Sequence, residues 1–238
     1  IISGAFGVFY KERVIAIGGY RVDTVGEDMD LVVRLHRNMR DEKRTYRITF
    51  VPDPICWTEA PTDLKSLKNQ RMRWQRGLAE SLTSNLGLMF NFRGGTVGWL
   101  AFPFMILFEM VGPAIEVLGY IAMISLWWLD LIPLQSFLVF LFASIGLGVL
   151  LSTNAMFLEE LSFQMYPRPG QQLKLFVAAV LENFGYRQIN SVWRFMGLCK
   201  WLFSTRRRGH WGEIARDGSW QDHGEAPAGH ADAPASTP

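Results

Sequence analysis

Residues 97–158 contain no Lys or Arg and consist mainly of Leu, Ile, Val, Phe, Gly and Trp, and this apolar stretch limits the possible folds most strongly. As one helix, Val97–Leu129 would be roughly 50 Å long at 1.5 Å per residue, well beyond a bilayer core of about 30 Å. Pro103 and Pro113 are expected to break such a helix. The composition therefore predicts a membrane region built of more than one segment.

We expect Val97–Glu109 to lie along the membrane interface or to enter it obliquely. Pro113–Leu129 would then cross the membrane, with Trp127 and Trp128 in the far aromatic belt. Ser136–Leu158 would cross back. The two spans together predict a helical hairpin.

Two carboxylates, Glu109 and Glu116, fall inside this apolar region. Ionisable side chains within a membrane are costly and often functional. Two interpretations are open at this point: both face a polar channel, or each lies near the interface and pairs with a basic residue.

The segment after the hairpin, residues 173–203, is apolar but also carries Glu, Asn, Gln and Arg side chains. If it crossed the membrane once, Lys200 and Arg206–Arg208 would lie outside, against the positive-inside rule. We therefore prefer an amphipathic, in-plane or re-entrant helix to a third span. The basic cluster would then lie at the cytoplasmic surface, on anionic lipid.

The first 95 residues have the ordinary charge and patterning of a soluble α/β segment. Strands are predicted at Ala5–Tyr10 and Tyr46–Asp53. Thr24, with Glu27 three residues later, gives a capping-box signal for a helix. A long helix is predicted over residues 62–87. Its apolar face is expected to include Leu64, Leu67, Trp74 and Leu78.

These features predict an α/β domain followed by membrane helices, in four parts. The parts are residues 1–95 (α/β), 96–160 (two spans), 161–204 (amphipathic, re-entrant or third membrane helix) and 205–238 (basic juxtamembrane segment and disordered tail). The opening "IISGAFGVFY" has no initiator Met and no polar lead-in. We therefore expect the C-terminal part of a longer protein.

Charge and cysteine usage argue against several classes of function. A net charge of +2 is too small to indicate a nucleic-acid partner. Cys56 and Cys199 have no CxxC spacing, so neither a disulfide framework nor a zinc site is indicated. The sequence also has no GxGxxG, P-loop, HExxH or GxSxG motif.

The first group that could carry chemistry is Gly26-Glu27-Asp28. Local structure can explain it, because Glu27 can complete a capping box and Asp28 favours the positive end of a helix. In the functional interpretation, Asp28 is a general base that takes a proton from an attacking hydroxyl.

The second group is Gln70, Arg71, Arg73 and Trp74, just before the apolar region. Gln70, Arg73 and Trp74 share a helix face, because residues three and four apart are neighbours. A guanidinium fork matches phosphate oxygens, and an indole face can stack on a sugar ring. The alternative is a positive membrane flank anchored by Trp. That alternative predicts equal effects from Arg73→Ala and Arg76→Ala.

The third group is Ser3 and Gly4, within "ISGAFGVF". These small residues would let a bulky ligand approach the backbone. Taken alone, core packing of a strand explains these residues better than a ligand site does.

Taken together, "GEDMDLVVRLHR", "WTEAP", "QRMRWQRG" and the membrane helices that follow resemble the C-terminal part of a membrane-embedded family 2 glycosyltransferase. That group includes cellulose, hyaluronan and poly-N-acetylglucosamine synthases. The resemblance covers roughly residues 1–160, in order. It implies a GT-A catalytic domain on the cytoplasmic face of the inner (plasma) membrane, joined to a multi-pass transmembrane region.

The resemblance also implies roles for particular residues. Asp28 would be the catalytic base of an inverting transfer from a nucleotide-sugar donor to a growing polysaccharide or glycan acceptor. The implied substrate-binding residues are Glu27, Gln70, Arg71, Arg73, Trp74, Ser3 and Gly4. Among these, Arg73 would hold the diphosphate and Trp74 would line the acceptor site. The bilayer is an implied partner, and an export protein is a further one.

The implied cofactor is Mg²⁺ or Mn²⁺, whose DxD ligands in this family lie upstream of the residues present here, so the chain alone is expected to be inactive. The sequence departs from the family in two places: Gly26 replaces the Thr of the family's TED motif, and no FxVTxK-like gating segment is found. Two other classes stay open. One is a non-catalytic membrane scaffold or polysaccharide-export subunit that keeps the glycosyltransferase shape. The other is a transporter built around Glu109 and Glu116.

Overall fold

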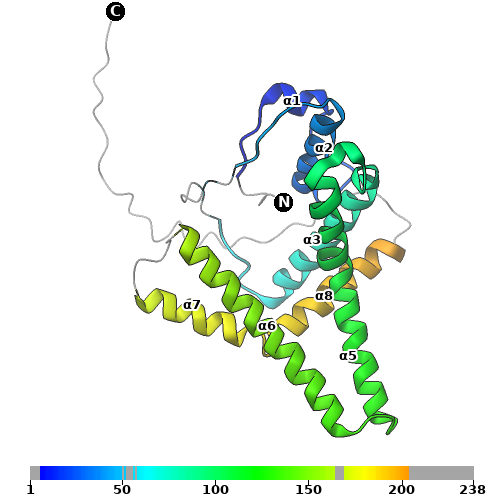
Figure 1. The fold of residues 1–238 in the computed structure, drawn as a ribbon, viewed down its shortest axis with the longest axis vertical. Coiled ribbons are helices and arrows are strands. Elements are labelled where there is room, and N and C mark those ends of the chain that lie inside the picture. Colours follow the sequence, from blue (N-terminus) through cyan, green and yellow to red (C-terminus); the bar gives the residue numbers. More distant parts are fainter. Residues whose placement is uncertain (1–5, 50, 52–55, 57, 164–168, 204–238) are drawn as a thin grey trace, which may run out of the picture.

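The computed structural model describes residues 6–49, 51, 56, 58–163 and 169–203, and this part of the chain is helical (Figure 1). The elements up to the long apolar helices are α1 (Lys11–Ala16), α2 (Glu27–Asp41), α3 (Leu64–Ser84), η1 (Leu86–Leu88) and η2 (Phe92–Gly94). They are followed by η3 (Val97–Ala101), α4 (Phe102–Phe104), η4 (Met105–Val111), α5 (Gly112–Trp128), α6 (Leu134–Phe163), α7 (Pro169–Leu181) and α8 (Tyr186–Phe203).

The two predicted strands, Ala5–Tyr10 and Tyr46–Asp53, do not form in their described residues. A strand requires ladder hydrogen bonds to a neighbouring strand. The described part of the chain contains no such neighbour. The predicted α/β class is therefore not confirmed.

The capping box predicted from Thr24 and Glu27 is wrong. The N-cap of α2 is Gly26, which makes no side-chain cap. The hydroxyl of Thr24 donates to Glu80 on α3 at 2.9 Å and accepts from Gly26 N at 3.2 Å. Its oxygen therefore accepts from the N-cap residue itself and not from an N–H in the first turn of α2.

The long helix predicted over residues 62–87 is confirmed as α3. Its N-cap is Asp63, whose carboxylate accepts from Ser66 N at 2.8 Å. Hydrogen bonding from Ser66, first from its side chain and then from its backbone N–H, lowers the pKa of Asp63. The predicted apolar face is wrong in part, because Leu64 is 72% exposed and Trp74 is 50% exposed. The buried positions of α3 are Met72, Gln75, Gly77, Leu78, Ala79, Ser81 and Leu82.

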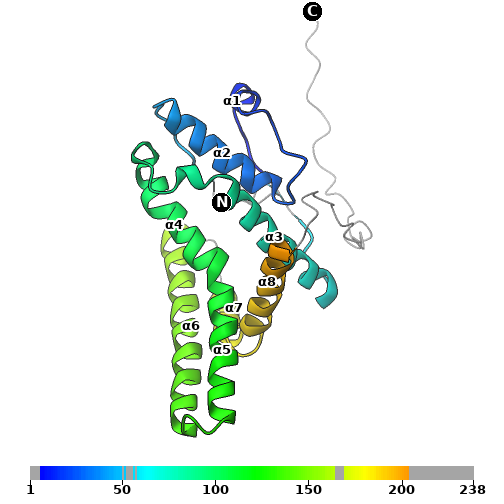
Figure 2. The same ribbon diagram turned by 90° about the vertical axis from the view of Figure 1, so that its right-hand side faces the viewer.

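The hydrophobic core lies where α3 meets the start of the apolar region. Leu78 and Leu82 of α3 pack with Leu88 and Phe102. Around them lie partly buried residues of α2, of the apolar helix and, after η1, of the connecting segment: Met29, Val33, Met89, Val97, Met105, Ile106 and Met110. The apolar helix is therefore anchored on the soluble helices before it continues away from them (Figure 2).

The predicted break at Pro103 and Pro113 is wrong, because Val97–Trp128 is one continuous helical segment of 32 residues. Its π-helical turns, η3 and η4, precede the two prolines. Such turns change the hydrogen-bond register at the point where a proline has no N–H to offer. Pro113 also lies in the first turn of α5, where a missing N–H costs little.

The predicted hairpin is confirmed as a pair of long helices. Val97–Trp128 and Leu134–Phe163 are both long and apolar enough to cross a membrane, and only 17% and 6% of their most apolar windows are buried. The two helices meet at a short turn, where Trp127 stacks on Phe137 with ring centroids 5.5 Å apart. Away from this turn they diverge (Figure 1).

Residues 173–203 do not form a single helix. Glu182–Gly185 separates α7 from α8, and Gly185 has a φ of 104°, which favours glycine. α7 packs against α6, whereas α8 packs against both α3 and α5. Within the described residues, neither α7 nor α8 qualifies as a candidate span.

The contact between α3 and α8 leads to a first prediction. A Cβ added at Gly197 would lie 2.6 Å from Met72 O and 3.0 Å from Met72 Cα, both backbone atoms that cannot move aside alone. Gly197→Ala should therefore destabilise the protein by about 1–3 kcal/mol, the usual cost of overpacking. Thermal unfolding of the detergent-solubilised protein measures this effect. The matched control is Gly119→Ala, which meets no atom within 4 Å and should be neutral or stabilising.

Candidate functional site

The start of α2 lies directly against α3 through two glycines. A Cβ added at Gly77 would lie 2.8 Å from Gly26 Cα, and one added at Gly26 would lie 2.9 Å from Gly77 Cα. The backbones can touch because neither residue has a side chain. Asp28 follows Gly26 by two residues, and Arg73 precedes Gly77 by one helical turn. The contact thus brings the two predicted site motifs together.

Glu80 holds the loop that leads to Asp28. One carboxylate oxygen accepts from Thr24 Oγ1 at 2.9 Å and from Val25 N at 3.1 Å. The other oxygen accepts from Arg76 Nε at 2.7 Å. Ser81 Oγ donates to Gly26 O at 3.4 Å, which adds a further link. The loop is therefore fixed to α3 by side chains from the turn after Gly77.

The two aspartates at the start of α2 have different environments. Asp30 is 1% exposed and accepts from Arg34 Nε at 2.7 Å. Arg34 in turn donates to Ile17 O and Gly19 O, so Asp30 is part of a structural network. Asp28 is half-buried and accepts only from Met29 N, at 2.7 Å, among the described residues. The second carboxylate oxygen of Asp28 therefore accepts no hydrogen bond from the described residues.

The arginine and tryptophan group on α3 has a different arrangement from the predicted face. Arg71 lies over the ring of Trp74, 4.8 Å from its centroid. The Nε of Arg71 is buried and has no hydrogen-bond partner within the described part of the chain. Gln70 and Arg73 are half-buried on the same helix. The predicted helix is confirmed, and the stacked pair is Arg71 with Trp74.

Arg76 is a structural residue and not part of a generic basic flank. Its ion pair with Glu80 supports the loop before Asp28. The comparison of Arg73→Ala with Arg76→Ala, suggested by the sequence, therefore does not separate the two interpretations. Lys65 is exposed on the same helix and is the better control.

A second cluster joins α3 to the membrane region. In an α-helix, the carbonyl of Glu109 would accept from the N–H of residue 113, but residue 113 is a proline. Gln75 Nε2 donates to this carbonyl at 3.1 Å and Arg194 Nη2 donates to it at 2.6 Å. Arg194 also donates to Gln75 Oε1 at 2.8 Å and to the Glu109 carboxylate at 2.9 Å. One junction thus links α3, η4 and α8.

Glu116 is paired in a similar way, further along the apolar helix. Its carboxylate accepts from Ser191 Oγ at 2.8 Å and lies 3.6 Å from Arg187 Nε. Tyr120 Oη donates to it at 3.4 Å. Both membrane-region carboxylates therefore pair with basic residues of α8, which favours the pairing interpretation over an open channel.

The remaining predicted site residues are Ser3, Gly4 and Glu27. Ser3 and Gly4 lie outside the described residues. Glu27 is half-buried at the start of α2. The described residues contain no group of three or more His, Cys, Asp or Glu side chains that could hold a metal ion. They therefore do not fit a Mg²⁺ or Mn²⁺ site by themselves.

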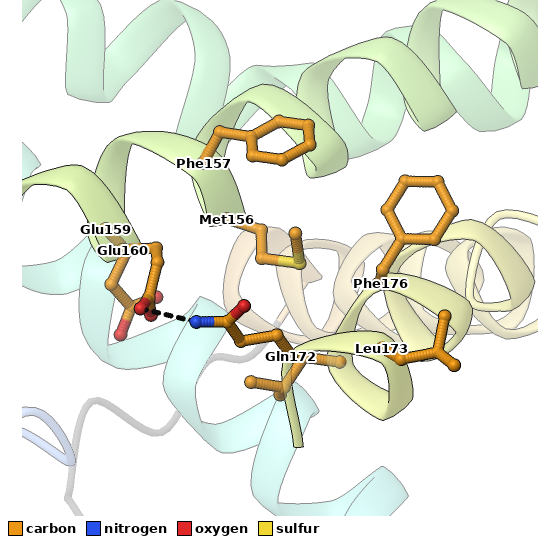
Figure 3. A pocket seen from close by; sticks show the side chains of 8 residues that line it. Met156, Phe157, Glu159, Glu160, Gln172, Leu173 and Phe176 are labelled. Atoms are coloured by element: carbon orange, nitrogen blue, oxygen red, sulfur yellow. Dashed lines mark hydrogen bonds between the residues drawn. The ribbon is translucent and has the colours of Figure 1, made fainter. Parts of the chain in front are cut away.

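A cavity of about 330 Å³ lies elsewhere, between the end of α6 and the start of α7 (Figure 3). Its walls include Met156, Phe157 and Phe176, and Gln172 donates to Glu160 at 2.8 Å at its edge. It contains none of the predicted site residues.

Comparison with known protein families identifies the family of this chain. Residues 1–151, more than half of the chain, match the family described as Glycosyl transferase family group 2. The chain belongs to this family.

Relatives with a described function match part of the chain. Over 81 residues, the chain is 37% identical to the poly-beta-1,6-N-acetyl-D-glucosamine synthase of Staphylococcus aureus (strain COL). It is 33% identical, also over 81 residues, to the synthase of the same name from Staphylococcus epidermidis (strain RP62A). The match covers 34% of this chain and only 18% of the length of each relative. No solved structure matches the chain.

Four residues that organise the site were not predicted: Gly77, Glu80, Gln75 and Arg194. Gly77 had a usable signal, because a glycine inside a strong helix pattern often marks a close backbone contact. The other three act through partners 34 to 119 residues away in the sequence, so no local pattern identifies them.

The links of Glu80 give a second prediction. Glu80→Gln keeps the size of the side chain but removes its charge, so it weakens the bonds from Val25 N, Thr24 and Arg76. We expect a loss of about 1–3 kcal/mol in unfolding free energy, the range for hydrogen bonds to charged groups. We also expect at least a tenfold loss of glycosyl transfer by the full-length protein. Glu12→Gln on α1 is the control, and equal effects of both variants would contradict the positioning role.

The junction at Arg194 gives a third prediction. Arg194→Met removes donors to Gln75 and to the Glu109 carbonyl, and it leaves the Glu109 carboxylate unpaired. We expect destabilisation of about 1–3 kcal/mol, with allowance for partial exposure of the pair. Arg194→Lys should restore only part of this, since an ammonium cannot reproduce the planar fork. Thermal unfolding in detergent is the measurement, with Lys174→Met as control. Full recovery with lysine would contradict the geometry.

Proposed function

We propose that this chain is the C-terminal part of a membrane-bound inverting glycosyltransferase that extends a polysaccharide or glycan from a nucleotide-sugar donor. The observation that carries the proposal is the joining of two motifs. Asp28, at the start of α2, is held against the helix that carries Arg71, Arg73 and Trp74. Family membership provides the class of reaction.

In this proposal Asp28 is the catalytic base. Its uncommitted carboxylate oxygen takes the proton from the acceptor hydroxyl as the hydroxyl oxygen bonds to the anomeric carbon. The bond from that carbon to the diphosphate oxygen breaks, and the diphosphate leaves with the bonding electrons. Attack from the face opposite the leaving group inverts the anomeric centre. Glu27 adds a second carboxylate beside the acceptor.

Arg71, Arg73 and Gln70 receive the departing diphosphate. A guanidinium donates two parallel hydrogen bonds to phosphate oxygens, and such donors stabilise charge that develops in the transition state. The buried Nε of Arg71, unpaired within the described residues, is a donor suited to this role. Trp74 is half-exposed and offers an aromatic face to the acceptor sugar. Ser3 and Gly4 stay proposed as part of the acceptor site.

The remaining parts of the proposal follow from the family resemblance. Residues 1–95 would complete a GT-A α/β domain on the cytoplasmic face of the inner membrane. The two long apolar helices would cross that membrane, with the tail on the cytoplasmic side. Mg²⁺ or Mn²⁺, bound by residues upstream of this chain, stays a prediction, and the roles given above do not depend on it. An export partner also stays a prediction.

A non-catalytic scaffold or export subunit with the same shape is the second candidate. Gly26, at the position of the family's threonine, is the observation that favours it. The glycine is nevertheless required for the contact with Gly77, so its presence has a structural reason.

The proposed function gives a fourth prediction. The full-length protein in membrane vesicles should incorporate sugar from a labelled nucleotide donor, and nucleotide-activated N-acetylglucosamine is the first to test because of the relatives' names. Asp28→Asn should reduce incorporation about 1,000-fold, within the ~10²–10⁴ range typical of general-base removal. Arg73→Ala should reduce it about 100-fold, as for loss of one donor to transition-state charge.

The controls separate the two candidates. Lys65→Ala removes a cation from the same helix and should leave incorporation within about twofold of the unmodified protein, since surface charges contribute little. Incorporation that survives Asp28→Asn would exclude Asp28 as the base. Equal losses from Arg73→Ala and Lys65→Ala would favour the interpretation of the arginines as a positively charged membrane flank.

A further inference from the structure

A second site lies at the far end of α2 from Asp28. A cavity of about 490 Å³ is lined there by Arg40, Lys43, Arg44, Thr45, Tyr46 and Arg93. Four of these six residues are cations and none is an acid. Asp28 and Arg40 are separated by 12 positions of one helix, or roughly 18 Å, so this cavity is distinct from the proposed catalytic site.

Part of the cavity wall is held in place before any ligand binds. The guanidinium of Arg40 lies over the ring of Tyr46, 5.3 Å from its centroid, and Arg40 Nε donates to Tyr46 Oη at 3.2 Å. His36 Nδ1 lies 2.6 Å from the same hydroxyl. Burial lowers the pKa of His36, so this ring adds no charge at neutral pH. Gly95 leaves room for Arg40, because a Cβ there would lie 2.9 Å from Arg40 Nη1.

The surroundings do not neutralise the four cations. Arg44 pairs with Glu42 at 2.7 Å, but Arg13 also lies 3.6 Å from that carboxylate. The C-terminus of α2 contributes only about half a negative charge. Lys43 has a left-handed backbone conformation (φ 55°), at a position after a helix where glycine is the usual residue. The backbone does not require a lysine there, so its ammonium group adds positive charge without a structural reason. The cavity therefore has an excess of positive charge that an anion would offset.

The neighbouring surface indicates where that anion comes from. Arg93 directly follows Phe92, whose ring is 5.8 Å from Trp99, and Phe90 lies 5.4 Å from the same indole. These three side chains, which we call the aromatic cluster, are 92%, 48% and 51% exposed for Phe92, Trp99 and Phe90. Exposed aromatic side chains of this kind lie at the headgroup level of membranes.

The length of the apolar helix agrees with this position. Its 32 residues extend roughly 48 Å at 1.5 Å per residue, slightly more than the ~40–45 Å of a bilayer with its headgroups. Trp99 lies near one end and Trp127 and Trp128 lie at the other. We propose that the cavity lined by Arg40, Lys43, Arg44 and Arg93 binds the phosphate headgroup of an anionic phospholipid, while the aromatic cluster inserts beside it.

The test compares lipid binding by two double variants of the full-length protein. Lys43→Ala/Arg93→Ala removes two exposed cations that have no ion pair within the described residues. Lys11→Ala/Lys65→Ala removes the same charge from exposed positions outside the cavity and is the matched control. Native mass spectrometry of the purified protein in detergent counts bound phosphatidylglycerol and phosphatidylcholine at equal lipid concentrations.

We expect the unmodified protein and the control to bind phosphatidylglycerol at least fivefold better than phosphatidylcholine. Lys43→Ala/Arg93→Ala should lose this preference while it binds phosphatidylcholine as before. An unchanged preference in this variant would overturn the proposal. No sugar donor is present, and Asp28→Asn should keep the preference, so the result does not depend on the proposed glycosyl transfer.

A second arm separates lipid from a soluble anion. Inorganic phosphate and glycerophosphoglycerol carry the same charged group without acyl chains. If the site is a lipid site, neither should displace phosphatidylglycerol at concentrations equal to that of the lipid. Displacement by either compound at equal concentration would overturn the lipid assignment and identify a site for a soluble phosphate.

Discussion

A missing backbone N–H at Pro113 shapes the centre of this structure. A proline has no N–H, so in α-helical register it offers no donor to the carbonyl of Glu109. Gln75 and Arg194 supply the donors from two other helices. The proline thus converts a local defect into the contact that joins the helix of the QRMRW motif to the apolar helix and to α8. This contact adds to the direct packing of α8 against α3 and α5.

Elements whose signal is local could be predicted from the sequence. The long helix at Leu64–Ser84, the paired apolar helices and the family itself follow from periodicity, composition and motif order. The strands could not be confirmed, because a strand exists only through its neighbours. The continuous helix through Pro103 was missed because a proline's effect depends on π-helical turns that propensity does not describe.

The candidate site also combines features that the sequence predicts with features that it does not. Asp28 and the arginine–tryptophan helix were predicted from residue type and spacing. Their connection was not, because it depends on Gly26 touching Gly77 and on Glu80 reaching a loop 55 residues away. The capping role predicted for Thr24 is absent because its oxygen accepts from Gly26 N, before the helix begins. Sequence patterns identify the chemical groups, whereas the contacts that position them are set by tertiary packing.

The place of α8 at the end of the described chain has a consequence for how the protein is made. The carboxylates of Glu109 and Glu116 are synthesised long before Arg194 and Arg187, which neutralise them. During translation, the nascent pair of apolar helices therefore carries two acidic side chains whose basic partners have not yet been made. Solvent must take the place of these partners until α8 emerges from the ribosome. A chain that stopped before α8 would leave both carboxylates without the ion pairs described above.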